Sequence, residues 1–228
     1  MKKLGIMFGL GISLIFFIVN LAQADLVTNP GDIPGPQVVL DFSQFSGVNF
    51  STAPVQVSEV PGYGVTLTGS FWYGDFSYNL GYLMHADPQN GYWSSPQHYV
   101  ASGEVGSAVG TLLFKFDTVR VEAVGAVVNY DPYYGAPTMA VYDGGFNLLE
   151  SYNLADYGVS TPGQENAGEF RGIARSTADI RYFSLTGGME VLTNLTFTDA
   201  EPVPLPGAVW LVGTGLLGLV GWRRKLQS

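Results

Sequence analysis

The chain has 228 residues and carries 10 Lys and Arg against 19 Asp and Glu, a formal net charge of −9. Residues 25–200 alone hold five basic and 18 acidic residues, and such an acidic surface repels nucleic acid and anionic lipid. The chain has no cysteine, which excludes disulfides, thiol nucleophiles and cysteine-based zinc sites. Charged residues make up 13% and aromatic residues 14%, a composition that favours β-structure over solvated helices.

Residues 1–24 have the pattern of a secretory signal peptide. Lys2 and Lys3 form a basic start, residues 4–21 are apolar, and small residues at Ala22 and Ala24 predict cleavage before Asp25. The apolar part is long for a signal peptide, so an uncleaved N-terminal membrane anchor is the alternative. Under both interpretations the residues from 25 onward are exported.

The segment 25–200 is expected to form one domain of short strands. A Pro- and Gly-rich stretch at 29–36 can form neither a helix nor a ladder. The expected strands are 38–42, 65–72, 111–116, 119–129, 138–142, 148–152, 170–173, 180–185 and 192–198. No part of this segment shows a sustained 3.6-residue period. The pattern therefore predicts an all-β fold, an antiparallel sandwich or jelly roll.

Two of these segments give sharper expectations. The segment 119–129 alternates at first and then becomes wholly apolar, so Arg120 and Glu122 should face solvent. The residues expected to be buried are Val121, Val124, Val127, Phe183, Leu195 and Phe197. The turn residues Asp143, Gly144 and Gly145 predict a hairpin between 138–142 and 148–152.

Aromatic residues suggest two places for carbohydrate binding. Trp72 and Trp93 belong to an aromatic run over 71–99, and Tyr133 and Tyr134 belong to a tyrosine-rich loop at 130–135. Sugars stack their C–H faces on such rings, while Asn, Gln and Asp bind the hydroxyl groups. The alternative for both places is that the rings pack in the core and its loops.

Metal binding and catalysis have weaker signals. Carboxylates that could converge on calcium lie at expected strand ends or turns: Asp41, Asp117, Asp131, Asp143 and Asp199. None belongs to a complete metal motif, so no cofactor is expected beyond possible calcium. The two histidines, His85 and His98, lie in an expected irregular loop, and no motif of a hydrolase or nucleotide-binding site is present. A polysaccharide hydrolase that uses scattered carboxylates remains an alternative.

The tail 201–228 has three parts. A proline-rich break contains Val203, Pro204, Leu205 and Pro206. An apolar stretch at 207–222 follows, and a basic end is formed by Arg223, Arg224 and Lys225. As a helix, the apolar stretch would be about 24 Å long, short of the roughly 30 Å hydrocarbon core. The basic residues are expected to stay on the cytoplasmic side. An ordinary C-terminal transmembrane anchor is the alternative.

This three-part tail resembles the PEP-CTERM sorting signal of Gram-negative bacteria that make exopolysaccharide, with Leu205 where that family usually has Glu. The resemblance implies an exosortase-type membrane protease as partner, transient residence in the inner membrane, and a final place at the cell surface or in the extracellular matrix. Residues 114–197 also resemble the jelly-roll domain often found ahead of such tails, with Thr193 where an Asp is frequent.

These features together predict an exported envelope or matrix protein with a structural or adhesive, non-enzymatic role. A carbohydrate-binding module that retains exopolysaccharide is the second hypothesis, and a polysaccharide hydrolase is the third.

Overall fold

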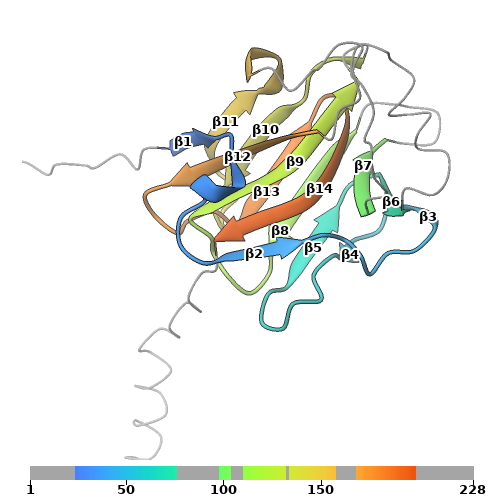
Figure 1. The fold of residues 1–228 in the computed structure, drawn as a ribbon, viewed down its shortest axis with the longest axis horizontal. Coiled ribbons are helices and arrows are strands. Elements are labelled where there is room, and N and C mark those ends of the chain that lie inside the picture. The colour runs from blue at the N-terminus through green and yellow to red at the C-terminus, as the bar shows by residue number, and fades with distance from the viewer. Residues whose placement is uncertain (1–23, 76–97, 104–109, 132–133, 158–167, 199–228) are drawn as a thin grey trace, which may run out of the picture.

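The computed structural model describes residues 24–75, 98–103, 110–131, 134–157 and 168–198. In these ranges the chain forms two antiparallel sheets that pack face to face, which confirms the predicted all-β sandwich (Figure 1). The segments predicted as an N-terminal signal helix and a C-terminal transmembrane helix lie outside these ranges. Within the ranges, no helix is long and apolar enough to cross a membrane.

The larger sheet has eight strands. Their order is β1-β12-β9-β14-β7-β6-β3, and β2 pairs with β14 beside this path. The strands are β1 (Ala24–Val27), β2 (Gln37–Leu40), β3 (Val48–Ser51), β6 (Phe71–Asp75), β7 (His98–Ser102), β9 (Ala123–Asp131), β12 (Glu169–Arg175) and β14 (Met189–Thr198).

The smaller sheet has six strands in the order β11-β10-β13-β8-β5-β4. They are β4 (Val55–Gln56), β5 (Val65–Thr68), β8 (Thr111–Phe116), β10 (Thr138–Tyr142), β11 (Leu148–Asn153) and β13 (Tyr182–Thr186). Strands β10 and β11 pair as the predicted hairpin. Two short 3-10 turns, η1 (Pro30–Asp32) and η3 (Leu154–Tyr157), lie in the connections.

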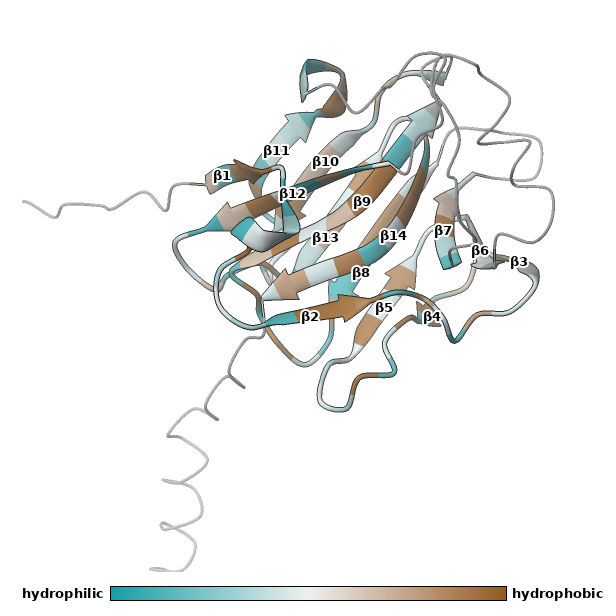
Figure 2. Cartoon of the chain, in the orientation of Figure 1, coloured by the Kyte–Doolittle hydropathy of each residue, from teal (hydrophilic) through white to brown (hydrophobic). Residues whose placement is uncertain are grey.

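The core lies between the two sheets, and hydrophobic residues are concentrated on strands such as β9, β14 and β5 (Figure 2). Five of the residues predicted to be buried have no exposed surface: Val121, Val124, Phe183, Leu195 and Phe197. The prediction was wrong for Val127, which is half-buried. Along β9 the inward positions are Val124, Ala126 and Val128, so Val127 points to the outer face and packs beside Phe170 there.

The start of the predicted segment 119–129 is not a strand. Strand β9 begins only at Ala123. Before it, Val121 and Ile180 form an isolated antiparallel β-bridge, in which the backbone N–H of each residue donates to the carbonyl oxygen of the other. Arg120 is exposed as predicted, whereas Glu122 is half-buried rather than fully in solvent. The alternation over 119–122 therefore comes from one bridging residue between two polar neighbours.

The predicted single strand over 65–72 is wrong, because the chain changes sheet within it. Strand β5 ends at Thr68 in the six-stranded sheet, and β6 begins at Phe71 in the eight-stranded sheet. Gly69 makes the crossing with φ +119, and a Cβ placed there would lie 2.2 Å from the carbonyl oxygen of Thr111. Only glycine fits such a conformation and such a close approach.

Strand β14 has three neighbours. It pairs with β9 along one side, and on the other side with β7 near Val191 and with β2 from Leu195 onward. Its register shifts between Thr193 and Thr196, where Asn194 has a φ of +50. This bulge bends the strand and marks the place where its partner changes from β7 to β2.

Candidate functional site

Two of the four residues predicted to bind carbohydrate lie in the described ranges, and Trp93 and Tyr133 lie outside them. Trp72 is on β6 and is half-buried on the outer face of the eight-stranded sheet. Its ring tilts against Phe50 of β3 at a centroid distance of 4.9 Å. It also packs against an outer cluster formed by Tyr99, Ala101 and Val191, all nearly or fully buried. Trp72 therefore has a packing role.

Tyr134 has 40% of its surface exposed and follows the end of β9. Strands β6 and β9 are three places apart in the sheet order, a lateral distance of roughly 14 Å. The fold therefore does not bring Trp72 and Tyr134 together on neighbouring strands.

A different group of rings lies on the outer face of the six-stranded sheet, and we call it the ring cluster: Tyr142, Phe146 and Tyr182. Phe146 stacks on Tyr142 with a centroid distance of 4.6 Å and an angle of 1° between the ring planes. It meets Tyr182 edge to face at 5.0 Å. Phe146 remains 52% exposed. Phe146 is therefore supported by two rings of the sheet while about half of its surface is open to solvent.

The hairpin turn between β10 and β11 holds Phe146 in this place. One carboxylate oxygen of Asp143, Oδ1, accepts hydrogen bonds from the backbone N–H groups of Gly145 at 2.8 Å and Asn147 at 2.9 Å. The Asn147 side chain donates to Oδ2 at 2.9 Å. These bonds, the Asn147 side chain foremost, hold the pKa of Asp143 below its usual value. Phe146 has a φ of +62, which bulky residues seldom adopt, so the turn maintains a strained conformation that displays the ring.

Basic side chains lie around the ring cluster. Arg120 is exposed, and its Nη2 atom is 3.5 Å from where a Cβ of Gly144 in the turn would be. Arg181 precedes Tyr182 and donates hydrogen bonds to the carbonyl oxygens of Asp117 and Val119. Lys115 of β8 is the register partner of Tyr182 and forms an ion pair with Asp117 at 2.8 Å. Thus Arg120 beside the turn and Lys115 beside Tyr182 place two of the five basic residues of segment 25–200 next to this cluster.

Polar groups extend from the ring cluster across the outer face of the six-stranded sheet. Thr66 of β5 is the register partner of Lys115, and Gln56 of β4 is the partner of Thr66. The hydroxyl of Thr66 and the amide of Gln56 both donate to Asp117 Oδ2. Burial acts to raise the pKa of Asp117, but the hydrogen bonds from Lys115, Thr66 and Gln56 outweigh it and lower that pKa. The outcome is a strip that is aromatic at one end and hydrogen-bonding at the other.

The predicted calcium ligands are not brought together where the structure describes them. Asp41 accepts a hydrogen bond from the N–H of Ser43 at 3.0 Å, and this bond lowers its pKa. Asp117 and Asp143 serve the local networks above, the side chain of Asp131 is not described, and Asp199 lies outside the described ranges. No group of three or more potential metal ligands occurs among the described residues. Asp41 and Asp143 bond to backbone N–H groups of their own turns, and Asp117 bonds to side chains of neighbouring strands.

One buried carboxyl was not anticipated from the sequence. Glu190 of β14 has no exposed surface, and its two carboxyl oxygens accept no hydrogen bond from any described residue. Burial raises its pKa to about 8. The carboxyl is therefore mostly neutral at pH 7, with its backbone N–H bonded to the hydroxyl of Ser102 at 3.2 Å.

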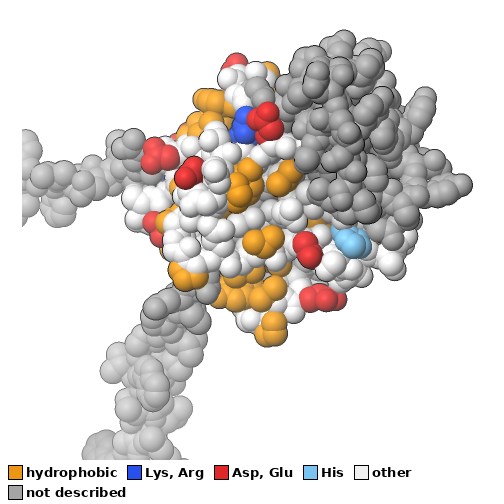
Figure 3. Space-filling view, in the orientation of Figure 1, with side chains coloured by type: hydrophobic (Ala, Val, Ile, Leu, Met, Phe, Trp, Pro, Cys, Tyr) orange, Lys and Arg blue, Asp and Glu red, His pale blue; other side chains and the backbone are white. Residues whose placement is uncertain are grey.

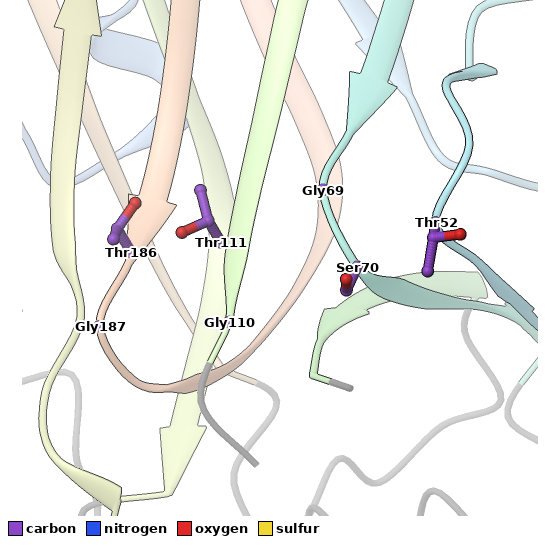
Figure 4. Close-up of a pocket in the computed structure, with 7 residues that line it drawn as sticks. All are labelled: Thr52, Gly69, Ser70, Gly110, Thr111, Thr186 and Gly187. Atoms are coloured by element: carbon purple, nitrogen blue, oxygen red, sulfur yellow. The ribbon is translucent and has the colours of Figure 1, made fainter. Parts of the chain in front are cut away.

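A cavity of about 530 Å³ opens where strands β5, β8 and β13 reach one edge of the fold (Figure 4). Its lining consists of glycines and hydroxyl side chains: Thr52, Gly69, Ser70, Gly110, Thr111, Thr186 and Gly187. These groups can form hydrogen bonds, but none of them titrates near neutral pH. His98 is outside this lining. It begins β7 instead of lying in a loop, whereas His85 lies outside the described ranges.

The ring cluster was missed because its members are distant in sequence. Tyr142 ends β10 and Tyr182 begins β13, the two residues are register partners, and Phe146 comes back over them from the turn. A usable signal was present, since Asp143 and Asn147 flank a ring in a tight hairpin.

Residues 202–225 match the family described as the PEP-CTERM protein-sorting motif. No curated protein matches the chain. The matched stretch spans Val203, Pro204, Leu205 and Pro206 as well as Arg223, Arg224 and Lys225, so it coincides with the tail predicted from the sequence. The chain is thus an exported β-sandwich protein that carries a PEP-CTERM sorting motif and is targeted to an exosortase.

Proposed function

We propose that the protein has a structural or adhesive, non-enzymatic role at the cell surface or in the extracellular matrix, after exosortase processing of its tail. The observation that carries this proposal is the order of parts: the sorting motif begins at residue 202, four residues after the last described strand of the sandwich ends at Thr198. Such an order delivers the folded body to the outside of the cell and leaves it intact when the tail is removed.

The chemistry of three described carboxylates, Asp41, Asp117 and Asp143, supports a non-enzymatic role. Asp41 and Asp143 satisfy backbone N–H groups in turns, and Asp117 belongs to an ion pair and a hydrogen-bond network. Groups with such low pKa values and such occupied oxygens are suited to holding structure. A general acid needs a proton to give, and a nucleophile needs a free oxygen. Glu190 has both, but it has no exposed surface at which a substrate could meet it.

The second candidate function is retention of exopolysaccharide by a carbohydrate-binding module. The exposed ring cluster favours it, because sugar stacking needs an aromatic face that is both supported and open. In this proposal the exopolysaccharide is a partner outside the cell.

The sorting step is tested by cell fractionation and mass spectrometry of the native chain. Body peptides are expected in envelope or extracellular material without the peptide that contains Arg223. A chain with Pro204→Ala and Pro206→Ala should keep its tail and accumulate in the inner membrane, because the helix then continues upstream through the processing junction.

The matched control is Pro54→Ala, which changes an exposed proline far from the tail and should be processed normally. Recovery of the Arg223 peptide from extracellular material of the unaltered strain would contradict the processing proposal. The adhesive role predicts that cells without the protein lose cohesion, and that the unaltered chain restores it while the double proline variant does not.

A further inference from the structure

We infer that the ring cluster and the basic residues beside it form a binding site for an acidic polysaccharide, one whose sugar units carry carboxylate groups. The inference rests on the proposed function, since such a ligand is met only outside the cell. It goes beyond that function by naming the site and the chemical class of the ligand.

The stacking half of the site is Phe146. Its ring is supported by Tyr142 at 4.6 Å and by Tyr182 at 5.0 Å, and just over half of its surface is open. An exposed hydrophobic ring costs free energy in water, and here the backbone also takes up a rarely populated conformation to present it. Folding alone gains little from this arrangement. A ligand with a flat apolar face, such as the C–H face of a sugar ring, removes the exposed area from water.

The charge around the rings selects the class of sugar. The segment 25–200 has 18 acidic residues against five basic ones, and an anionic polymer is repelled from most of it. The face shown in Figure 3 has acidic side chains spread over it and few basic ones. Two of the five basic residues, Arg171 and Arg175, are nearly buried, and Arg181 is bonded to backbone carbonyl oxygens. The other two, Arg120 and Lys115, lie beside the ring cluster.

Arg120 is the residue best placed to bind a carboxylate. It is exposed, and it forms no hydrogen bond or ion pair with any residue that the structure describes. The nearby carboxylate of Asp143 is turned inward to the N–H groups of its own turn. The planar guanidinium therefore keeps donors free for a bidentate bond with a carboxylate of the ligand.

The geometry of the strip fits an extended chain of sugars. Tyr142, Tyr182, Lys115 and Thr66 are successive register partners on four adjacent strands, so they lie in one row on the outer face. The row spans three strand spacings, roughly 14 Å. A chain lying along it would meet rings first, then the ammonium group of Lys115, and then the hydroxyl of Thr66.

The test measures retention of the purified full chain, kept in detergent, in gels that contain alginate as the acidic probe or dextran as the neutral probe. Alginate should retard the unaltered protein, and dextran should not. Phe146→Asn removes the ring but tolerates the left-handed backbone, so retention by alginate should fall about tenfold or more while the melting temperature stays unchanged. Arg120→Gln should weaken retention by alginate severalfold and make it less sensitive to salt.

The matched control is Val39→Asn, which removes an equally exposed hydrophobic side chain from β2 on the other sheet and should bind alginate normally. Normal retention of Phe146→Asn with an unchanged melting temperature would overturn the inference. Equal retention of the unaltered protein by dextran would overturn the assignment to acidic sugars. Should Phe146→Asn melt early, Arg120→Gln decides the matter, because Arg120 has no structural bonds to lose. If the protein reaches the matrix but is not retained by alginate, this site is refuted, whereas the proposed function is not.

Discussion

The outer faces of the two sheets differ in how far their aromatic residues are exposed to solvent. On the eight-stranded sheet, Tyr99 is fully buried and Trp72 is half-buried against it. On the six-stranded sheet, Phe146 keeps 52% of its surface exposed above Tyr142 and Tyr182. Both faces are aromatic, but of these rings Phe146 is the one most open to solvent.

The difference arises from where the rings lie along the chain. Tyr99 and Trp72 are inside strands, where large neighbours fill the space beside them: Phe50 is the register partner of Trp72, and Val191 packs in the same outer cluster as Tyr99. Phe146 lies in a tight turn whose hydrogen bonds fix the backbone independently of the ring. Rings inside strands therefore contribute to stability, while a ring on a rigid turn is free to serve recognition.

The largest expected effect concerns inward and outward positions on β9. Val128→Asp places a charge in the core between the sheets and should leave the domain unfolded, because such a charge costs several kcal/mol against a total stability of about 5–15 kcal/mol. Val127→Asp is expected to leave the domain folded with reduced stability, since Val127 is half-buried on the outer face. Circular dichroism melts compare the two variants. Equal losses would show that both faces of β9 are equally enclosed.

The next largest effect separates the two kinds of ring. Tyr99→Ala should lower the free energy of unfolding by about 3–5 kcal/mol, because it leaves a cavity in the outer cluster. Phe146→Gly should change stability little, because it removes a largely exposed ring and relieves a strained φ. Urea denaturation of both variants measures these differences. A large loss in Phe146→Gly would mean that the ring cluster stabilises the fold.

A third prediction concerns Glu190, which belongs to the eight-stranded sheet. Its pKa is raised to about 8 by burial, whereas in the unfolded chain it stays near 4.5. The unfolded state therefore loses its proton first as pH rises, so stability should fall between about pH 4.5 and pH 8. Glu190→Gln should remove this fall and raise the melting temperature most at pH 8. An unchanged pH profile in Glu190→Gln would show that other groups cause the dependence.

The smallest effect concerns the turn that displays Phe146. The pKa of Asp143 is lowered by its bonds to Asn147, so its contribution is present at neutral pH and is lost as pH falls through that lowered pKa. Asp143→Ala should loosen the stack of Phe146 on Tyr142 without unfolding the domain. The ring-current shifts of the Tyr142 signals in NMR spectra report the stack.

The control for this variant is Asp41→Ala, which removes a comparable turn carboxylate near Ser43 and should leave the Tyr142 signals in place. Unaltered Tyr142 signals in Asp143→Ala would show that the rings hold each other without the turn.

Much of the fold could be read from local patterns. Strands β8 and β10 have the bounds expected from the sequence, and the Asp143 turn joins β10 to β11 as expected. The short strands β1, β3, β4 and β7 were not expected, because they hold only two to five residues each, too few for a clear period. The change of sheet at Gly69 was missed because alternation continues through it.

The sorting tail and the ring cluster also differ in how well they could be predicted from the sequence. The sorting tail could be recognised because its signal is contiguous, from the prolines to Arg223, Arg224 and Lys225. The ring cluster could not, because it depends on the register between β10 and β13 and on the path of one turn. Aromatic density alone pointed to Trp72, which the fold uses for packing.

Strand β14 also determines when the body can complete its fold. It is the last strand that the structure describes, yet it lies in the interior of its sheet, where it joins β9 to both β2 and β7. The contacts between β14 and β2 link residues near 197 with residues near 38, so the contact order is high and closure is slow. The sheet therefore cannot close until the chain is present through Thr198. Assembly of the body thus waits for residues that lie only four positions before the sorting motif begins.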